Sequence, residues 1–384
     1  MTSRPPMIRT DNSNPFANHT MHVRVPATVR EIAALNPDYP PAIRQALEAL
    51  AAEMANNQPM LRLDLPTPDY DDWQAVFAPH AGETWQNTDW FFAELFAYRR
   101  VIQAVRWWET GRDPFAPKKL AEYTGERPWK LLDQALTAEG SLEERLVALL
   151  DFALWGNRVD LSYAIAASHG QVQDDDLLVD DRAAVAAHLL HSAGTVHLVA
   201  DNAGSELLLD LALLDLVLRE LSANVILHLK LHPTFVSDAT AEDTRWLIAH
   251  LQSGLRGERA AQLGHRLAAA LATGQLRLAP DGYWNSPRLL WDLPPRLTET
   301  FTGARLVLIK GDANYRRLSG DALWPPETPF AEVANYFPAP LVALRSLKSD
   351  PIAGLAPGLA ERLAAVDPQW RTNGRRGIVQ ARLG

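Results

Sequence analysis

The chain has 384 residues, of which 47% are hydrophobic and 22% charged, with a net charge of −9 and no cysteine. This composition is ordinary for a globular protein that buries a sizeable core, and it excludes disulfides, thiolate metal sites and cysteine nucleophiles. The negative charge argues against a nucleic-acid binder, no apolar run reaches the roughly 18 residues of a membrane span, and the first residues lack an apolar signal core. We therefore expect a cytoplasmic protein without a membrane or nucleic-acid partner, and composition leaves its oligomeric state open.

The first part of the chain is predicted to be helical. Residues 1–20 are polar and rich in Pro, Asn and Ser, which indicates a flexible tail. Apolar residues then recur at helical spacing in three segments: 29–35, 41–56 and 89–109. Glu94 and Arg99 lie inside the last of these helices, where a structural ion pair with each other or with neighbours is the favoured interpretation. We place a helical N-terminal subdomain at 21–155.

Alternation of strands and helices begins near residue 195. Short apolar runs predict strands at 196–200, 225–231, 276–278, 305–309 and 341–344. Helical segments separate them, which is the pattern of a parallel sheet with helices on both faces. The predicted fold class is therefore α/β, a three-layer α/β/α domain with a mainly parallel sheet at 156–384.

The loop after the first of these strands carries closely spaced polar groups, namely Asp201, Asn202 and Glu206 around Gly204. Open parallel sheets bind ligands at the carboxyl ends of their strands, and the N-terminus of the next helix favours an anion. A carboxylate and an amide oxygen side by side suit a hard divalent cation. The same residues can also form a simple turn with a helix cap, because Asp, Asn and Gly favour turns.

Polar loops after the other strands are expected to meet this loop at one edge of the sheet. Neighbouring strands lie about 4.8 Å apart, so Asp238 can join Asp201 and Asn202 around one ion. These three are the predicted catalytic and metal-binding residues. The later loops supply the predicted substrate-binding residues Asp312, Asn314, Tyr315, Arg316, Arg345 and Lys348. A metal beside Arg and Lys side chains is the combination that holds a phosphate group.

Two further residues belong to the predicted substrate site. Glu206 follows the metal loop, and Asn157 lies in the polar loop 154–162 between apolar segments, a common place for functional residues. The chain has no Walker loop, no Gly-x-Gly-x-x-Gly and no Gly-x-Ser-x-Gly, which argues against the usual nucleotide-binding loops and against a serine hydrolase.

Four segments resemble motifs of the damage-control phosphatase family, and in particular its acidic-residue methyltransferase-like subfamily. They are Asp-Asn-Ala-Gly-Ser-Glu at 201–206, Phe-Val-Ser-Asp at 235–238, Lys-Gly-Asp-Ala-Asn-Tyr-Arg at 310–316 and Arg-Ser-Leu-Lys at 345–348. The third motif is the specific one, whereas an Asp-Asn-x-Gly loop alone is common. Ser346 stands where the family pattern Arg-Thr-x-Lys has threonine, and it keeps the hydroxyl. The resemblance covers roughly residues 85–380.

The resemblance implies a helical N-terminal part packed on an α/β/α domain. It implies a divalent metal, such as manganese, cobalt, nickel or magnesium, held by Asp201, Asn202 and Asp238. It also implies a small sugar phosphate bound by residues 312–316 and Lys348, with fructose 1-phosphate and fructose 6-phosphate both fitting the family. Glu206 matches the position linked to a methyltransferase activity that would use S-adenosylmethionine.

The resemblance implies hydrolysis of a small phosphorylated metabolite, with a role in metabolite damage control. The metal would activate a water while Arg316 and Lys348 neutralise the phosphoryl group, or Asp201 would attack directly and form an aspartyl-phosphate. Two other functions remain open. One is an S-adenosylmethionine-dependent protein carboxyl methyltransferase, although no glycine-rich methyltransferase loop follows a strand. The other is a sugar-phosphate binding protein without catalysis.

Overall fold

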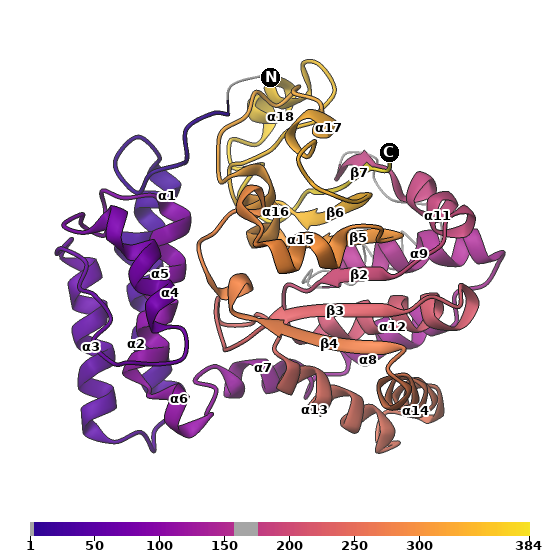
Figure 1. The fold of residues 1–384 in the computed structure, drawn as a ribbon, viewed down its shortest axis with the longest axis horizontal. Coiled ribbons are helices and arrows are strands. Elements are labelled where there is room, and N and C mark those ends of the chain that lie inside the picture. The colour runs from indigo at the N-terminus through magenta and orange to yellow at the C-terminus, as the bar shows by residue number, and fades with distance from the viewer. Residues whose placement is uncertain (1–3, 157–175) are drawn as a thin grey trace.

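A seven-stranded sheet organises the larger part of the computed structural model, which describes residues 4–156 and 176–384 (Figure 1). The strand order is β1-β7-β6-β5-β2-β3-β4, and β7 runs antiparallel to β6, while the other neighbours pair in parallel. The strands are β1 Leu177–Asp180, β2 Val196–Val199, β3 Val225–Lys230, β4 Leu276–Asp281, β5 Leu306–Lys310, β6 Leu341–Ser346 and β7 Gly377–Arg382. The five predicted strands are confirmed, and β1 and β7 were not predicted.

Helices cover both faces of the sheet, which confirms the predicted three-layer α/β/α arrangement (Figure 1). Alternate strand residues divide between two cores, as the pleat of a β-strand requires: Leu308 packs on one face, and Val307 and Ile309 on the other. One face carries α8 Arg127–Leu136, α9 Leu142–Trp155, α11 Arg182–His191, α12 Ser205–Glu220, α13 Ala241–Gln252 and α14 Glu258–Thr273. The other face carries α15 Pro295–Phe301, α16 Asp312–Ser319, α17 Phe330–Val333 and α18 Leu359–Val366.

A separate helical bundle packs beside the sheet domain and has its own core (Figure 1). It contains α1 Pro15–His19, α2 Val25–Leu35, α3 Pro41–Ala55, α4 Tyr70–Phe77, α5 Trp90–Ala104 and α6 Trp107–Thr110. Helix α5 is its central element, because nearly every residue from Trp90 to Ile102 is buried. A helix that is apolar on all sides must be surrounded by other elements. The helical N-terminal part is thus present.

The beginning of the chain differs from the predicted flexible tail. Met7 pairs with Ala322 and Arg9 with Asp89, and helix α1 follows at once. Ala17 has no exposed surface. The segment is polar on average, but the few apolar side chains within it are buried against the bundle, and these contacts order its backbone.

The boundary between the two parts also differs from the predicted one. Helices α8 and α9 lie before residue 155, yet Trp129, Leu146 and Leu150 belong to the hydrophobic core of the sheet domain. Phe115 is the last buried residue that the N-terminal part of the chain contributes to the core of the bundle. Helical content alone therefore misplaced the boundary, because helices α8 and α9 bury their apolar sides against α12 and not against the bundle. Within the described residues, no helix is both long and apolar enough to cross a membrane.

Two histidines on neighbouring strands face each other in the core of the sheet domain. The Nδ1 atom of His197 on β2 lies 3.0 Å from the Nε2 atom of His228 on β3, and both rings contact Phe301. Burial lowers the pKa of His197 to about 4 and the pKa of His228 to about 3. Both imidazoles therefore stay neutral in the folded protein at pH values where the unfolded chain would protonate them.

We expect the free energy of unfolding to fall as the pH drops from about 6.5 towards 4, because the unfolded chain then takes up protons that the folded protein excludes. Each histidine should contribute about 2 kcal/mol to this loss at pH 5. Urea unfolding at about pH 7.5 and about pH 5 measures it. The double variant His197→Leu and His228→Leu should show a shallower pH dependence, and an unchanged dependence contradicts the assignment. Imidazole NMR signals of neutral rings at acidic pH in the native protein give an independent check.

Candidate functional site

The predicted metal-binding residues come together where β2 and β3 end. Asn202 and Asp238 form an isolated antiparallel bridge between the two loops. The backbone N–H of Ala239 donates to the carbonyl oxygen of Asp201 at 2.8 Å, and that of Ala203 donates to the carbonyl oxygen of Ser237 at 2.7 Å. The two loops are therefore tied into one backbone unit that presents Asp201, Asn202 and Asp238 on the same side.

The Asp201 carboxylate lies directly against Gly311, the glycine between β5 and α16. A Cβ atom at this position would overlap the carboxylate of Asp201. Gly311 also has a φ of 83°, which residues with side chains rarely adopt. The sequence Lys-Gly-Asp therefore needs glycine for two reasons, and one of them is the space that it leaves for Asp201.

The side chain of Asn202 links the carboxylates around it. Its Nδ2 atom donates to Asp201 Oδ2 at 2.7 Å and to Glu206 Oε2 at 3.0 Å. Its Oδ1 atom accepts a hydrogen bond from Ser237 Oγ at 2.5 Å. The amide nitrogen thus faces the two acidic side chains, as electrostatics requires for a group between two carboxylates.

A buried lysine lies on the inner side of these acids. Lys310 Nζ is 3.0 Å from Glu206 Oε1 and 2.9 Å from Asp210 Oδ1, and it also donates to the carbonyl oxygen of Ala153 at 2.6 Å. Burial raises the pKa of Asp210 to about 7, even though Lys310 opposes the shift. Burial by itself would lower the pKa of Lys310, but the two carboxylates outweigh it and raise this pKa.

A second buried lysine lies beside Asp238. Lys230 Nζ is 3.2 Å from Asp238 Oδ2 and donates to the carbonyl oxygen of Trp284 at 2.8 Å. Burial lowers the pKa of Lys230 and raises the pKa of Asp238. Burial and the neighbouring charges of Glu206 and Asp238 raise the pKa of Asp201 well above its ordinary value. Within the described residues, Glu206 and Asp238 each form an ion pair with a lysine, whereas Asp201 forms none.

These properties fit a single hard cation. Asp201 and Asp238 are 7% and 2% exposed, and their mutual repulsion would be relieved by a positive ion between them. The donor set would be two carboxylates and one amide, which are oxygen ligands of the kind that magnesium and manganese accept. No group of three or more His, Asp or Glu side chains in the described parts of the chain is arranged to hold a metal. The third acid, Glu206, is instead paired with Lys310.

Asp312 and Lys348 lie on the β5 and β6 side of this site. Asp312 Oδ1 accepts from Arg345 Nε at 2.7 Å and from the backbone N–H of Lys348 at 3.0 Å. Burial would raise the pKa of Asp312, but the charges of Arg345 and Arg316 and the hydrogen bonds from Ser349 and the Lys348 backbone together outweigh it and hold this pKa below its usual value. Lys348 is exposed, and its positive charge opposes the rise in the pKa of Asp201. Lys348 therefore lies near the predicted metal-binding residues.

Arg345 and Arg316 occupy places that differ from the predicted ones. The guanidinium group of Arg345 also donates to the carbonyl oxygens of Ser349 and Pro351, and the residue is 1% exposed. All three guanidinium nitrogens of Arg316 donate to Glu94 or to Asp321. Every guanidinium nitrogen of both residues already has a partner inside the protein, so both arginines form structural contacts. The phosphate contacts expected of them stay predictions.

Asn314 and Tyr315 likewise hold the scaffold together, and they too were predicted to bind substrate. Asn314 Nδ2 donates to the carbonyl oxygens of Ala200 at 3.0 Å and Lys310 at 2.9 Å, which joins α16 to the end of β2. The Tyr315 hydroxyl is buried and lies 3.2 Å from Gln380 Oε1. Asn157 lies outside the described residues.

The structural interpretation of Glu94 and Arg99 is confirmed, with partners that sequence spacing did not indicate. Glu94 binds Arg316, and the guanidinium group of Arg316 lies 3.6 Å from the ring centre of Trp90. Arg99 Nε lies 2.7 Å from Asp69 Oδ2. The anion predicted at the N-terminus of α12 is supplied by the protein itself, because the Glu122 carboxylate accepts the Ser205 N–H at 3.1 Å.

Sequence reasoning missed Lys230, Lys310 and the contacts of α7 Ala116–Glu122 with the metal loop. Each lysine is the last residue of an apolar strand, and a charged residue at the end of a buried strand is a usable signal. Glu122 and the adjacent Tyr123 gave no such signal, because their contacts with residues 204 and 205 are made across more than 80 positions of sequence.

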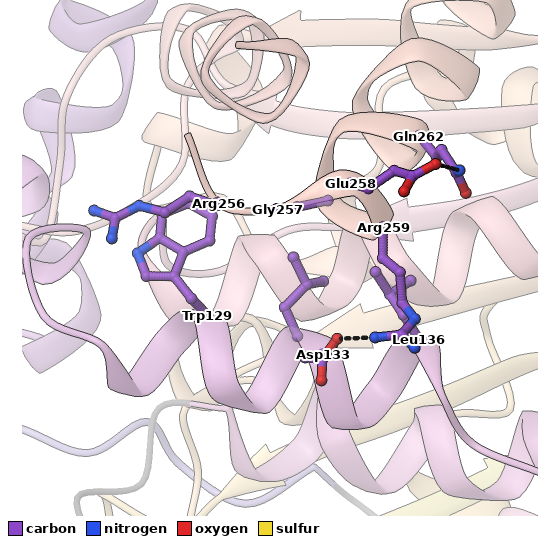
Figure 2. Close-up of a pocket in the computed structure, with 10 residues that line it drawn as sticks. Trp129, Asp133, Leu136, Arg256, Gly257, Glu258, Arg259 and Gln262 are labelled. Atoms are coloured by element: carbon purple, nitrogen blue, oxygen red, sulfur yellow. Dashed lines mark hydrogen bonds and ion pairs between the residues drawn. The ribbon is translucent and has the colours of Figure 1, made fainter. Parts of the chain in front are cut away.

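A separate surface cavity of about 480 Å³ lies between α8 and the start of α14 (Figure 2). Its polar side chains bind each other, with Arg259 donating to Asp133 at 2.9 Å and Gln262 donating to Glu258 at 3.1 Å. The predicted site residues that the structure describes do not line it. This cavity is therefore distinct from the candidate site at the ends of β2 and β3.

Comparisons with known proteins identify the family and the fold. A family model described as the damage-control phosphatase ARMT1-like domain matches residues 20–363. Relatives named damage-control phosphatase ARMT1 include one from Mus musculus, 33% identical over 328 residues, which covers 77% of this chain and 74% of the relative. One from Homo sapiens is 30% identical over 376 residues and covers 87% and 85%. A DUF89 family protein from Pyrococcus horikoshii shares the fold, with a TM-score of 0.51 at 16% identity over 94% of this chain and 96% of that chain.

Replacing Gly311 by alanine should cost more stability than replacing Gly303 by alanine. Their φ angles are 83° and 78°, so both alanines bear a similar backbone strain of about 1–2 kcal/mol. Open space surrounds a Cβ atom at Gly303, whereas at Gly311 it meets Asp201. We expect Gly311→Ala to lower the free energy of unfolding by about 1–3 kcal/mol more than Gly303→Ala in urea denaturation. Equal losses would show that Asp201 does not depend on the space at Gly311.

Proposed function

This chain belongs to the damage-control phosphatase ARMT1-like family, and we propose that it is a metal-dependent phosphatase that hydrolyses small sugar phosphates. The proposal rests on one observation above all. Asp201 and Asp238 are buried carboxylates that lie together with Asn202 at the ends of adjacent parallel strands, and the charge of Asp201 is poorly compensated by protein groups. The exposed Lys348 lies close enough to Asp201 for its positive charge to lower the pKa of that carboxyl group.

Asp201, Asn202 and Asp238 would hold the ion, which we expect to be manganese, cobalt, nickel or magnesium. Such an ion, when bound, lowers the pKa of a water ligand and offsets charge that develops on a phosphoryl oxygen. The Asn202 amide now turns its nitrogen towards Asp201, so binding requires its oxygen to face the ion instead. After this half turn the Asn202 nitrogen could donate to the Ser237 hydroxyl, and the bound ion would have to offset the lost hydrogen bonds to Asp201 and Glu206.

The residues around the ion have separate tasks in this mechanism. Lys348 binds phosphoryl oxygens in place of the buried Arg316, and the ionised Asp312 accepts a hydrogen bond from a sugar hydroxyl. Fructose 1-phosphate and fructose 6-phosphate are suitable substrates of this class. The attacking group is either water or the Asp201 carboxylate, and in both cases the phosphorus–oxygen bond to the sugar breaks and the sugar oxygen takes up a proton from water. If Asp201 attacks, a water then cleaves the aspartyl-phosphate, which releases phosphate and regenerates the carboxylate.

Among the residues that the structure describes, the contacts of Glu206 do not favour the methyltransferase alternative. Glu206, the residue linked to it by resemblance, is buried, and its carboxylate contacts Lys310 and Asn202. These contacts are those of a group that balances charge beside the metal site. The function of a sugar-phosphate binder without catalysis shares the whole site with the phosphatase, so only a turnover measurement separates the two.

The proposal predicts phosphate release from fructose 1-phosphate or fructose 6-phosphate with manganese, cobalt, nickel or magnesium, and none in the presence of a chelator. Asp201→Asn keeps the shape of the side chain but removes a charged oxygen ligand, and we expect it to lower kcat/KM at least about a hundredfold. Colorimetric phosphate assays on a panel of sugar phosphates measure both effects. If the protein binds a sugar phosphate but releases no phosphate with any of these metals, it is a non-catalytic sugar-phosphate binder. Tight binding of S-adenosylmethionine would instead favour the methyltransferase. Trapping of a phosphorylated Asp201 by mass spectrometry would select direct attack over water.

Lys348→Ala should affect activity, whereas Arg316→Met should affect stability. Loss of Lys348 removes a phosphate contact, so we expect kcat/KM to fall about a hundredfold at unchanged thermal stability. Loss of Arg316 leaves Glu94 and Asp321 buried without their partner, so we expect the free energy of unfolding to fall by about 3–5 kcal/mol. Lys118→Ala, at an exposed lysine paired with Glu31, is the matched control and should change neither quantity. Full activity of Lys348→Ala would remove this residue from the site.

A further inference from the structure

One short helix contacts both loops that carry the candidate metal ligands. Helix α7 covers Ala116–Glu122, and Tyr123 follows it directly. The Tyr123 hydroxyl accepts a hydrogen bond from the Gly204 N–H at 2.8 Å and lies 3.2 Å from the Gly204 carbonyl oxygen, to which it donates. Both backbone groups of the residue that ends the Asp201 loop are thus bound by a single side chain.

Glu122 supports the same loop from the neighbouring position. Its carboxylate accepts the N–H of Ser205, the first residue of α12, at 3.1 Å. Gly204 has a φ of 74°, and a Cβ atom there would overlap the Glu122 carboxylate. The turn from the Asp201 loop into α12 is therefore shaped to fit these two side chains.

The same helix reaches the second loop through Lys119. This lysine is 3% exposed, and its Nζ atom lies 2.8 Å from Asp243 Oδ2 and 2.9 Å from Asp113 Oδ2. Asp243 Oδ2 also accepts the N–H of Thr240 at 2.9 Å, and the two residues form a capping box at the start of α13. Thr240 follows Asp238 by two residues, so Lys119 fixes the end of the loop that carries Asp238.

From these contacts we propose that Lys119, Glu122 and Tyr123, here called the α7 clamp, are positioning residues of the metal site, and that the Tyr123 hydroxyl sets its affinity for the ion. The proposal rests on the function proposed above. Groups that orient metal ligands from outside commonly change affinity or activity by about 10–100-fold when they are lost. Burial raises the pKa of Tyr123, so its hydroxyl keeps the proton that it donates.

The physical argument for Tyr123 is that its hydroxyl acts on the backbone and not on a ligand atom. Asp201, Asn202 and Gly204 share one short loop, and the loop has no side chain at Gly204 to hold it in place. Without the hydroxyl, the buried Gly204 N–H loses its partner, while the Gly204 carbonyl oxygen keeps only the N–H of Leu208 at 3.1 Å. The loss favours other loop conformations. The ring itself stays held, because it packs against Trp129 and Trp246.

Tyr123→Phe removes only the hydroxyl, and Mn²⁺ binding measured by isothermal titration calorimetry is the direct readout. We expect the dissociation constant for Mn²⁺ to rise about tenfold, with phosphatase activity restored at saturating Mn²⁺. Tyr336→Phe is the matched control, because its hydroxyl also donates to a carbonyl oxygen, that of Leu318 at 2.6 Å, and it should bind Mn²⁺ as the native protein does. Thermal unfolding without metal shows whether the variants are folded.

A second pair of variants keeps the test independent of Tyr123. Glu122→Gln retains an oxygen that accepts the Ser205 N–H and should keep nearly native affinity, whereas Glu122→Ala should lose affinity in the same direction as Tyr123→Phe. Native affinity in both Tyr123→Phe and Glu122→Ala overturns the proposal while the metal site stands. An affinity loss in Tyr336→Phe as large as in Tyr123→Phe also overturns it, because the effect is then a general loss of stability. Absence of Mn²⁺ binding in the native protein instead refutes the proposed function itself.

Discussion

The backbone hydrogen bonds between the loops after β2 and β3 are the constraint on which the candidate site depends. Val199 is paired with His228 in the sheet, so the two strands end at nearly the same level. The loops continue side by side and remain bonded to each other through Asp201 and Ala239. Because the pairing extends beyond the strands, carboxylates that are 37 positions apart in sequence are held at a fixed separation. Parallel strands provide this arrangement at one edge of the sheet only.

The second constraint is electrostatic. Buried acids and lysines alternate around the site, and each lysine is positioned by a backbone carbonyl oxygen as well as by acids, as with Lys310 and Ala153 or Lys230 and Trp284. Burying such groups is unfavourable unless they are paired and hydrogen-bonded. The pairing is good for Glu206 and Asp238 and poor for Asp201. A cation beside Asp201 would supply the partner that this carboxylate lacks, which is what a metal site at this position requires.

The sequence predicted those parts of the molecule that depend on local patterns. Apolar runs located the central strands, and the polar residues after them located Asp201, Asn202 and Asp238, because strand ends in a parallel sheet necessarily converge. Arg316 and Arg345 were predicted to bind phosphate because the sequence does not show that their side chains pair with Glu94 and Asp312. Glu94 lies 222 positions before Arg316, and no spacing rule connects such residues. The α7 contacts and the packing of α8 and α9 on the sheet were missed for the same reason.

Strand β7 has a consequence for the synthesis of the protein. Among the described strands, β1 pairs with β7 alone, and β7 is one of the two neighbours of β6. β7 covers residues 377–382 and follows all the other strands of the sheet in sequence, whereas β1 precedes them. A ribosome therefore releases almost all of the sheet domain before β1 gains its partner. Until then the growing chain exposes strand edges that can pair with other chains. Residues 377–382 thus complete the sheet, and products that terminate before β7 expose an open β-edge to chaperones and proteases.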